Sequence, residues 1–298
     1  MERVLITGAN GLLGQKLVIH FSKWFTVLAT SRQNDCFLPI KHFDYKPLEI
    51  TDKGGIHTVL TDLNPDLIIN AAAYTDVDGC EENKAEAKQV NVDAVQTLAD
   101  WCAGNGRKLI QYSTDYIFDG REGPYSEEAT PNPLCYYGQT KLESEKLIQN
   151  SGCQHLVIRS NVIFGVGEKV KNNFFLWTLE QFKAGKPFKV VDDQSNNPTL
   201  ADNLALATLE AVEKNLSGTI NIAGSEYLSR YEFATKLAEV FKLNKNLLSP
   251  TKTASLNQKA VRPLKGGLKL DLAKSLIHIP FLDVSTALDF IRTYYDIS

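Results

Sequence analysis

Short apolar runs alternate with longer amphipathic stretches through the first half of the chain. Strands are predicted at residues 4–7, 25–30, 67–72, 108–113 and 155–159, and helices at residues 11–22 and 85–104. The run at 67–72 is almost entirely apolar, which is typical of a strand that is buried on both faces. Strands that alternate with helices of this length predict βαβ units and a parallel sheet.

The alternation loosens after about residue 161. Late strands are predicted at 188–191 and 219–222, and helices at 201–213 and 284–294. A capping-box pattern, Ser229 to Glu232, begins one more helix. The apolar residues that share one face of this helix are Phe233, Ala234, Leu237, Ala238 and Phe241.

These patterns predict a doubly wound parallel α/β sheet of the Rossmann type with a smaller C-terminal domain. We expect residues 1–165 to form the dinucleotide-binding Rossmann domain, with later returns to it near 187–222 and 284–295. Residues 166–298 are expected to form most of the smaller domain.

A glycine-rich turn follows the first predicted strand and begins the first predicted helix. Glycines allow a tight turn and let backbone N–H groups approach a pyrophosphate at the positive end of a helix. Since strand, turn and helix together fit a βαβ unit, the pattern predicts dinucleotide binding. The expected contacts are Gly8, Asn10, Gly11, Leu12, Leu13 and Gly14.

The end of the second predicted strand bears on which dinucleotide binds. An acidic residue there would take the ribose hydroxyls of NADH. This strand instead ends in Thr30-Ser31-Arg32, and a hydroxyl with a guanidinium suits a 2′-phosphate. We therefore expect Ser31 and Arg32 to favour NADPH, with NADH left open as an alternative cofactor.

Tyr137 and Lys141 are four residues apart, so on a helix they share one face. A nearby cation is expected to lower the pKa of the Tyr137 phenol and to suit it to general acid catalysis. Thr114 ends a predicted parallel strand, where ligands bind in open α/β sheets. Its hydroxyl is expected to lie beside Tyr137.

These motifs resemble extended short-chain dehydrogenase/reductases and, within them, the dTDP-4-dehydrorhamnose reductases. The narrower resemblance runs through nearly the whole chain. It rests on Asn70 to Asp78, Tyr112 to Gly120, Asn132-Pro133-Leu134, Asp193-Gln194 with Pro198-Thr199, and Arg262-Pro263.

The resemblance implies NADPH-dependent reduction of a 4-keto nucleotide sugar, dTDP-4-dehydro-L-rhamnose, to dTDP-L-rhamnose. Tyr137 would protonate the developing alkoxide and Thr114 would orient its oxygen. Lys141 would hold Tyr137 electrostatically and reach the nicotinamide ribose. Further cofactor contacts would be Ala71, Ala72 and Ala73, and substrate contacts in or near the C-terminal, substrate-binding domain would be Asp115, Tyr116, Val162 and Arg262.

Three substrate-side positions depart from the pattern of these reductases. Val162 stands where they often carry an aromatic ring, the stretch from Asp193 to Thr199 lacks a common glycine, and Leu264 replaces a usual serine after Arg262-Pro263. The departures leave the reductase chemistry intact and leave the sugar and the nucleotide base open.

Two other functions remain open. One is a nucleotide-sugar epimerase/reductase, although Cys135 and His155 are interpreted as packing residues. A 4,6-dehydratase is disfavoured because Tyr116 stands where its acid is expected. The other is a non-catalytic NADP-binding regulatory subunit, like the β subunit of methionine adenosyltransferase.

Composition and charge narrow the set of partners. The chain has 298 residues and a formal net charge of −3, so nucleic acid and anionic membranes are not expected as main partners. Its N-terminus carries no signal-type segment, and we expect a cytoplasmic protein. The five cysteines are scattered along the chain, so we expect neither disulfides nor a metal site. A homodimer is left open.

Overall fold

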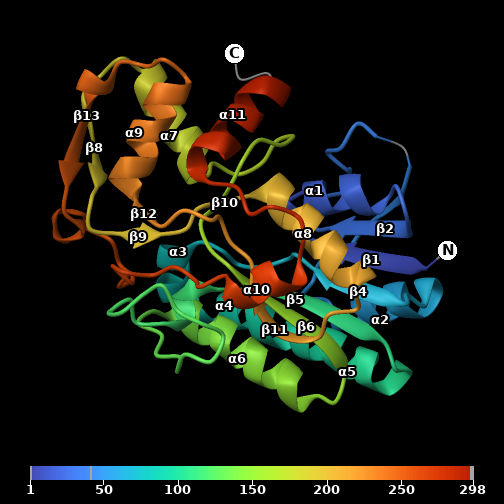
Figure 1. Cartoon of the computed structure of the whole chain (residues 1–298). Helices are drawn as coiled ribbons and strands as arrows, with labels where there is room; N and C mark the ends of the chain where they lie inside the picture. Colours follow the sequence, from blue (N-terminus) through green and yellow to red (C-terminus); the bar gives the residue numbers. More distant parts are fainter. Residues whose placement is uncertain (1, 41, 296–298) are drawn as a thin grey trace.

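The computed structural model describes residues 2–40 and 42–295 and has a seven-stranded parallel sheet at its centre (Figure 1). In spatial order the strands are β3 (Asp44–Pro47), β2 (Thr26–Ser31), β1 (Arg3–Thr7), β4 (Leu67–Asn70), β5 (Lys108–Thr114), β6 (Gln154–Ser160) and β11 (Gly218–Asn221). The order reverses between β1 and β4, which is where ligands bind in doubly wound sheets. The predicted fold class is confirmed.

Helices cover both faces of this sheet. On one face lie α1 (Leu12–Phe21), α8 (Ala201–Glu213) and α10 (Asp271–Leu276), and on the other lie α2 (Lys53–Leu63), α5 (Ala94–Asn105) and α6 (Tyr136–Asn150) (Figure 1). Neighbouring strand residues face opposite layers: Ile69 packs with α1 and α8, and Ile68 with α2 and α5. Burial on both faces explains the continuous apolar run in β4.

The helix predicted at 85–104 is built in three parts. A short α4 (Lys84–Lys88) leads through one π-helical turn, Gln89–Asp93, into α5, and α3 (Val77–Glu82) precedes it. The wider turn carries Asn91, whose side chain accepts from the Tyr74 N–H at 2.8 Å and donates to the Thr140 hydroxyl at 3.1 Å. It thereby ties the segment after β4 to α6.

A second apolar cluster forms the smaller lobe, which packs beside the sheet (Figure 1). It is built on α7 (Phe174–Lys183), α9 (Arg230–Val240), α11 (Val284–Tyr294) and the parallel pair β8 (Phe188–Val191) and β13 (Leu248–Thr251). Two-residue strands complete it: β7 (Ile163–Phe164) with β10 (Thr199–Leu200), and β9 (Ser195–Asn196) with β12 (Leu228–Ser229). The Ser229–Glu232 capping box is present at the start of α9.

The chain returns to the sheet in fewer places than expected. Within 187–222, α8 and β11 do return, but β8 pairs with β13 in the smaller lobe. Helix α11 packs on α9 and not on the sheet. Tyr295, which follows α11, hydrogen-bonds with Lys16 and Asp202 of the larger lobe. The apolar pattern of a strand does not show which other strand it pairs with. For this reason β8 was expected in the central sheet, whereas it pairs with β13 in the smaller lobe. The boundary at 165/166 stays a prediction, and Met1 and residues 296–298 lie outside the described residues.

Phe164 tests the smaller lobe. Its ring is fully buried, with the Phe233 ring edge-on at 5.1 Å. Because truncation leaves a cavity, Phe164→Ala should lower the free energy of unfolding by about 3–5 kcal/mol in denaturant titration. Tyr294→Ala, at an aromatic residue that is 71% exposed, is the control and should change it by less than about 0.5 kcal/mol. Equal effects would contradict the assignment of this core.

Candidate active site

The glycine turn lies at the switch point of the sheet and leaves no room for a side chain at Gly8 or Gly14. A Cβ on Gly8, whose φ is +66°, would lie 2.7 Å from the backbone of Ala71 and Ala72. A Cβ on Gly14 would lie 2.1 Å from the Gly8 carbonyl oxygen. The N-cap of α1 is Gly11, so its first-turn N–H groups carry no capping side chain from that position and suit an anion.

The other residues expected around the cofactor have mixed environments. Asn10 is buried and turned toward the loop after β2: it donates to the Asp35 carbonyl and accepts from the Phe37 N–H, both at 2.9 Å. The Ser31 hydroxyl lies 2.7 Å from the Tyr45 hydroxyl, whereas Arg32 is exposed. Leu12 and Leu13 lie in the first turn of α1.

Strand β4 ends two residues earlier than predicted, at Asn70. The Asn70 amide accepts from the Thr7 hydroxyl at 2.5 Å and donates to Gln111 at 2.7 Å, which links three neighbouring strands through buried polar groups. The chain then leaves the sheet, so Ala71, Ala72 and Ala73 lie in the loop that passes over the glycine turn.

The predicted catalytic residues converge at the carboxyl edge of the sheet. Thr114 ends β5, and its hydroxyl acts on the pKa of Tyr137, in the first turn of α6, so the two side chains lie close together. Lys141 lies one turn further along α6 and is 3% exposed. The helical spacing predicted for Tyr137 and Lys141 is therefore confirmed.

The pKa of Tyr137 is raised, which contradicts the expected lowering. Burial is the main cause, and it outweighs the attraction of any cation nearby. A phenol with a raised pKa stays protonated at neutral pH, so it is a proton donor. Burial also lowers the pKa of Lys141 to about 8, against the opposing effect of the Glu145 carboxylate.

Asp115 and Tyr116 form a single 3₁₀ turn after Thr114. The Tyr116 ring lies edge-on to the Tyr137 ring, with centroids 5.8 Å apart. The buried Asp115 carboxylate accepts from the Gly267 N–H at 2.9 Å, and its pKa is raised by burial. Asp115 therefore fastens a distant loop to the site.

We call residues 256–267 the strap. Arg262 forms two bonds of 2.8 Å to the Asp78 carboxylate, which also accepts from the Ala260 N–H. Lys259 of the strap forms an ion pair with Glu82, which lies in α3 together with Asp78. The Arg262 guanidinium, expected to contact substrate, thus holds the strap to the larger lobe, and its hydrogen bonds hold the pKa of Asp78 below its usual range.

Sequence analysis missed Arg230. Its Nη1 is buried without a hydrogen-bond partner, and its guanidinium lies 4.7 Å from the Phe174 ring centroid. It acts electrostatically on Asp115 and Tyr116, so it faces the site. One signal could have found it: a cation in the first turn of a helix opposes the helix dipole, and such a residue needs another reason to be there.

Val162 has a φ of 41°, in the left-handed region that β-branched residues rarely adopt. Its carbonyl accepts from the Thr199 N–H at 3.2 Å. Such strain persists where the surroundings enforce it, often at functional sites. Val162, one of the three positions expected to depart from the reductase pattern, is therefore also a strained one.

Cys135 and His155 have packing environments. Cys135 is buried before α6, and burial raises the pKa of its thiol. His155 lies at the opposite end of β6 from the site, with Nδ1 3.0 Å from the Cys153 carbonyl oxygen. The environments of Cys135 and His155 therefore do not favour the extra acid/base pair that an epimerase/reductase would need.

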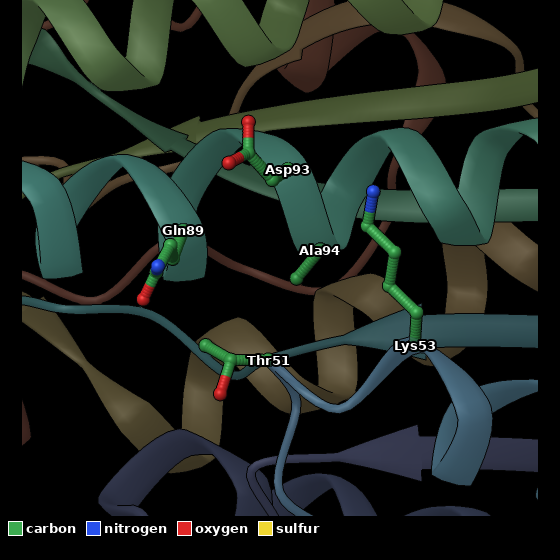
Figure 2. A pocket seen from close by; sticks show the side chains of 5 residues that line it. All are labelled: Thr51, Lys53, Gln89, Asp93 and Ala94. Carbon is green, nitrogen blue, oxygen red and sulfur yellow. The ribbon is translucent and has the colours of Figure 1, made fainter.

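A cavity of about 400 Å³ lies elsewhere, beside the start of α2 and the π-helical turn (Figure 2). Its lining is Thr51, Lys53, Gln89, Asp93 and Ala94, none of which is an expected site residue. Within residues 2–40 and 42–295, no cluster of three or more His, Cys, Asp or Glu side chains could hold a metal ion. No helix in the same part is long and apolar enough to cross a membrane.

The chain matches the RmlD substrate-binding domain family over residues 1–293. It is 33% identical over 266 residues to the "Probable low-salt glycan biosynthesis reductase" of Haloferax volcanii, covering 88% of each chain. It is 32% identical over 309 residues to the dTDP-4-dehydrorhamnose reductase of Aggregatibacter actinomycetemcomitans, covering 99% of each. It is also 32% identical to methionine adenosyltransferase 2 subunit beta of Bos taurus, covering 84% of this chain and 75% of that one.

A solved structure gives the same result. The dTDP-4-dehydrorhamnose reductase of Bacillus anthracis, in complex with NADP, superposes with a TM-score of 0.86 at 26% identity, covering 99% of each chain. These similarities confirm the resemblance drawn from the motifs.

The Asp78–Arg262 pair should hold the strap closed. Asp78→Ala leaves the Arg262 guanidinium and the Ala260 N–H without this partner, so amide hydrogen exchange within 256–267 should rise about tenfold or more. Asp62→Ala, which removes an exposed ion pair with Lys46, is the control. Unchanged exchange in the strap would show that Asp78 does not fasten it.

Proposed function

Since the chain belongs to the RmlD substrate-binding domain family, we propose that it is an NADPH-dependent reductase that converts dTDP-4-dehydro-L-rhamnose to dTDP-L-rhamnose. The observation that carries the proposal is the convergence of Thr114 and Tyr137, with the buried Lys141 one turn away, at the edge where the glycine turn lies. Its relatives include reductases with this named activity.

The residues present fit a dinucleotide. The backbone at Gly8 and Gly14 leaves no room for side chains, and the open first turn of α1 suits a pyrophosphate. Gly8, Gly11 and Gly14 would hold the pyrophosphate, Arg32 a 2′-phosphate, and Ala71 to Ala73 would border the remainder. When bound, NADPH supplies the hydride.

The chain's own residues then manage the proton. Tyr137 donates its phenolic proton to the oxygen of the sugar carbonyl as that oxygen gains negative charge. Thr114 donates a hydrogen bond that orients the same oxygen. Lys141, as an ammonium, stabilises the phenolate that Tyr137 becomes once it has donated its proton. Tyr137 is protonated at neutral pH, as the proton donor of a reduction must be, and the burial that raises its pKa does not change this.

Arg230 supplies charge for the substrate. Its Nη1 has no hydrogen-bond partner, and Asp115, Tyr116 and Arg262 all lie close enough to act on the guanidinium electrostatically. A nucleotide sugar carries a diphosphate, and guanidinium groups bind phosphate oxygens well. We assign Arg230 to the diphosphate, with Asp115, Tyr116, Val162 and Arg262 around the sugar side of the site.

The similarity to methionine adenosyltransferase 2 subunit beta favours one second candidate, a regulatory subunit that binds NADP without catalysis. The presence of Thr114 beside Tyr137, with Lys141 one helical turn further along α6, argues for turnover. We place the reaction in the cytoplasm, and a homodimer is left open.

Tyr137→Phe tests the proton donor. Removing the hydroxyl should lower kcat about 10²–10⁴-fold while NADPH binding stays within about twofold of the wild type. Steady-state NADPH oxidation and fluorescence titration of NADPH measure the two quantities. Tyr112→Phe, which removes a buried hydroxyl bonded to Thr208, is the matched control. Near wild-type turnover by Tyr137→Phe would refute the assigned role.

Arg32 tests the cofactor preference. Arg32→Ala should lower kcat/KM for NADPH about tenfold or more and leave that for NADH nearly unchanged, because only NADPH carries the 2′-phosphate. Lys23→Ala, a cation at the far end of α1, should change neither. Equal kcat/KM for the two cofactors in the wild type would overturn the preference.

A further inference from the structure

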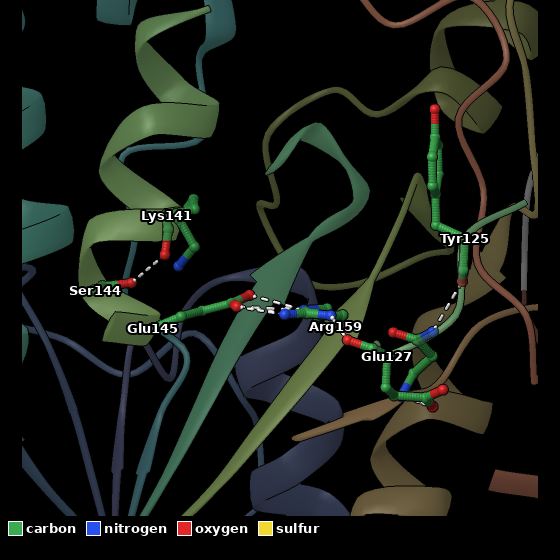
Figure 3. A network of polar contacts seen from close by, with 7 residues as sticks. Tyr125, Glu127, Lys141, Ser144, Glu145 and Arg159 are labelled. Carbon is green, nitrogen blue, oxygen red and sulfur yellow. Dashed lines mark hydrogen bonds and ion pairs between the residues drawn. The ribbon is translucent and has the colours of Figure 1, made fainter. Parts of the chain in front are cut away.

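A buried cluster of three charged side chains lies behind the predicted catalytic residues. Lys141 and Glu145 come from successive turns of α6, and Arg159 comes from β6 (Figure 3). All three are 5% exposed or less. Such groups are costly to bury, so their arrangement calls for a physical explanation.

The Glu145 carboxylate forms a two-bond ion pair with Arg159. Arg159 Nη2 donates to Glu145 Oε2 at 2.7 Å, and Nε donates to Oε1 at 3.1 Å (Figure 3). Arg159 Nη1 also donates to the Glu127 carbonyl at 3.0 Å, which fixes the guanidinium. Because arginine stays protonated in proteins, a positive charge lies directly against the Glu145 carboxylate.

We propose that Glu145 is a positioning residue for the reductase reaction: held as a carboxylate by Arg159, it keeps the Lys141 side chain in its ammonium form on the face of α6 that carries Tyr137. The inference rests on the proposed function. Neither Glu145 nor Arg159 needs to contact substrate or cofactor. Their effect passes through Lys141.

The surroundings of Lys141 support this reasoning. Burial alone favours the neutral amine and lowers the pKa of Lys141 to about 8, and Glu145 is the group that opposes the lowering. Tyr137 lies on the same helix, and Thr114 and Asp115 at the end of β5 act on Tyr137. Arg159, from β6, is a cation and cannot hold a proton on Lys141 except through Glu145. Activity that needs the ammonium is lost as pH rises through the pKa of Lys141.

The test measures Lys141 directly, so that it does not depend on turnover. In protein labelled with ¹³C at lysine Cε, the resonance that Lys141→Arg removes reports the protonation of Lys141. Its midpoint is expected at about 8 in the wild type. Glu145→Gln with Arg159→Gln removes both charges and leaves two amides to pair, and should lower the midpoint by about one pH unit. Glu145→Asp keeps the charge but draws it back, and should give a smaller lowering.

The control is Asp66→Asn with Arg107→Gln, another linked pair, bonded at 2.8 Å and lying at the opposite edge of the sheet. It should leave the midpoint unchanged. In the same variants, the pH at which kcat decreases on the alkaline side should shift together with the midpoint of Lys141. A merely structural role would lower kcat at every pH without shifting that decrease.

An unchanged midpoint in the folded double variant would overturn the proposal. If that variant does not fold, Glu145→Asp decides in the same way. A shifted midpoint in a protein that turns over no 4-keto nucleotide sugar would leave the electrostatic role of Glu145 standing and would instead refute the proposed function.

Discussion

The packing of α6 against β5 and β6 is the contact on which the site depends. One face of this helix carries Tyr137, Lys141 and Glu145 at intervals of one turn, and the strands present Thr114 and Arg159 to that face. Strands β5 and β6 are paired in register over seven positions, with Ser113 opposite Arg159. Hydroxyl, ammonium and carboxylate are therefore positioned together by regular secondary structure, which is stiffer than a loop.

The two lobes meet at the same edge through polar contacts. Asp115 accepts from Gly267, and Lys265 donates to the Gly120 carbonyl at 2.9 Å, so the strap lies against the turn that follows β5. Asp78 and Arg262 fasten its other part to α3. Arg230 of the smaller lobe also acts electrostatically on Asp115 and Tyr116. In the proposed reaction, the larger lobe would supply the cofactor-binding turn and the proton donor, and the smaller lobe would supply positive charge.

Local sequence predicted the features that depend on local geometry. The glycine turn, the Tyr137–Lys141 spacing and the Ser229–Glu232 capping box each involve residues within a few positions of one another. What could not be predicted depends on distant contacts. The partner of β8, the Asp78–Arg262 pair and the approach of Arg230 to Asp115 all join segments far apart in the chain. The pKa of Tyr137 was predicted in the wrong direction because spacing shows a nearby cation but not the extent of burial.

The proposed role of this site is the reduction of a 4-keto nucleotide sugar. The most direct measurement is NADPH oxidation by the wild-type protein with dTDP-4-keto-6-deoxy-L-mannose, made in situ from dTDP-glucose by a dehydratase and an epimerase, with the product identified by chromatography. The account predicts rapid, enzyme-dependent NADPH loss matched by formation of dTDP-L-rhamnose. Bound NADPH that is not consumed with this or any other 4-keto nucleotide sugar would contradict it and would favour a regulatory subunit.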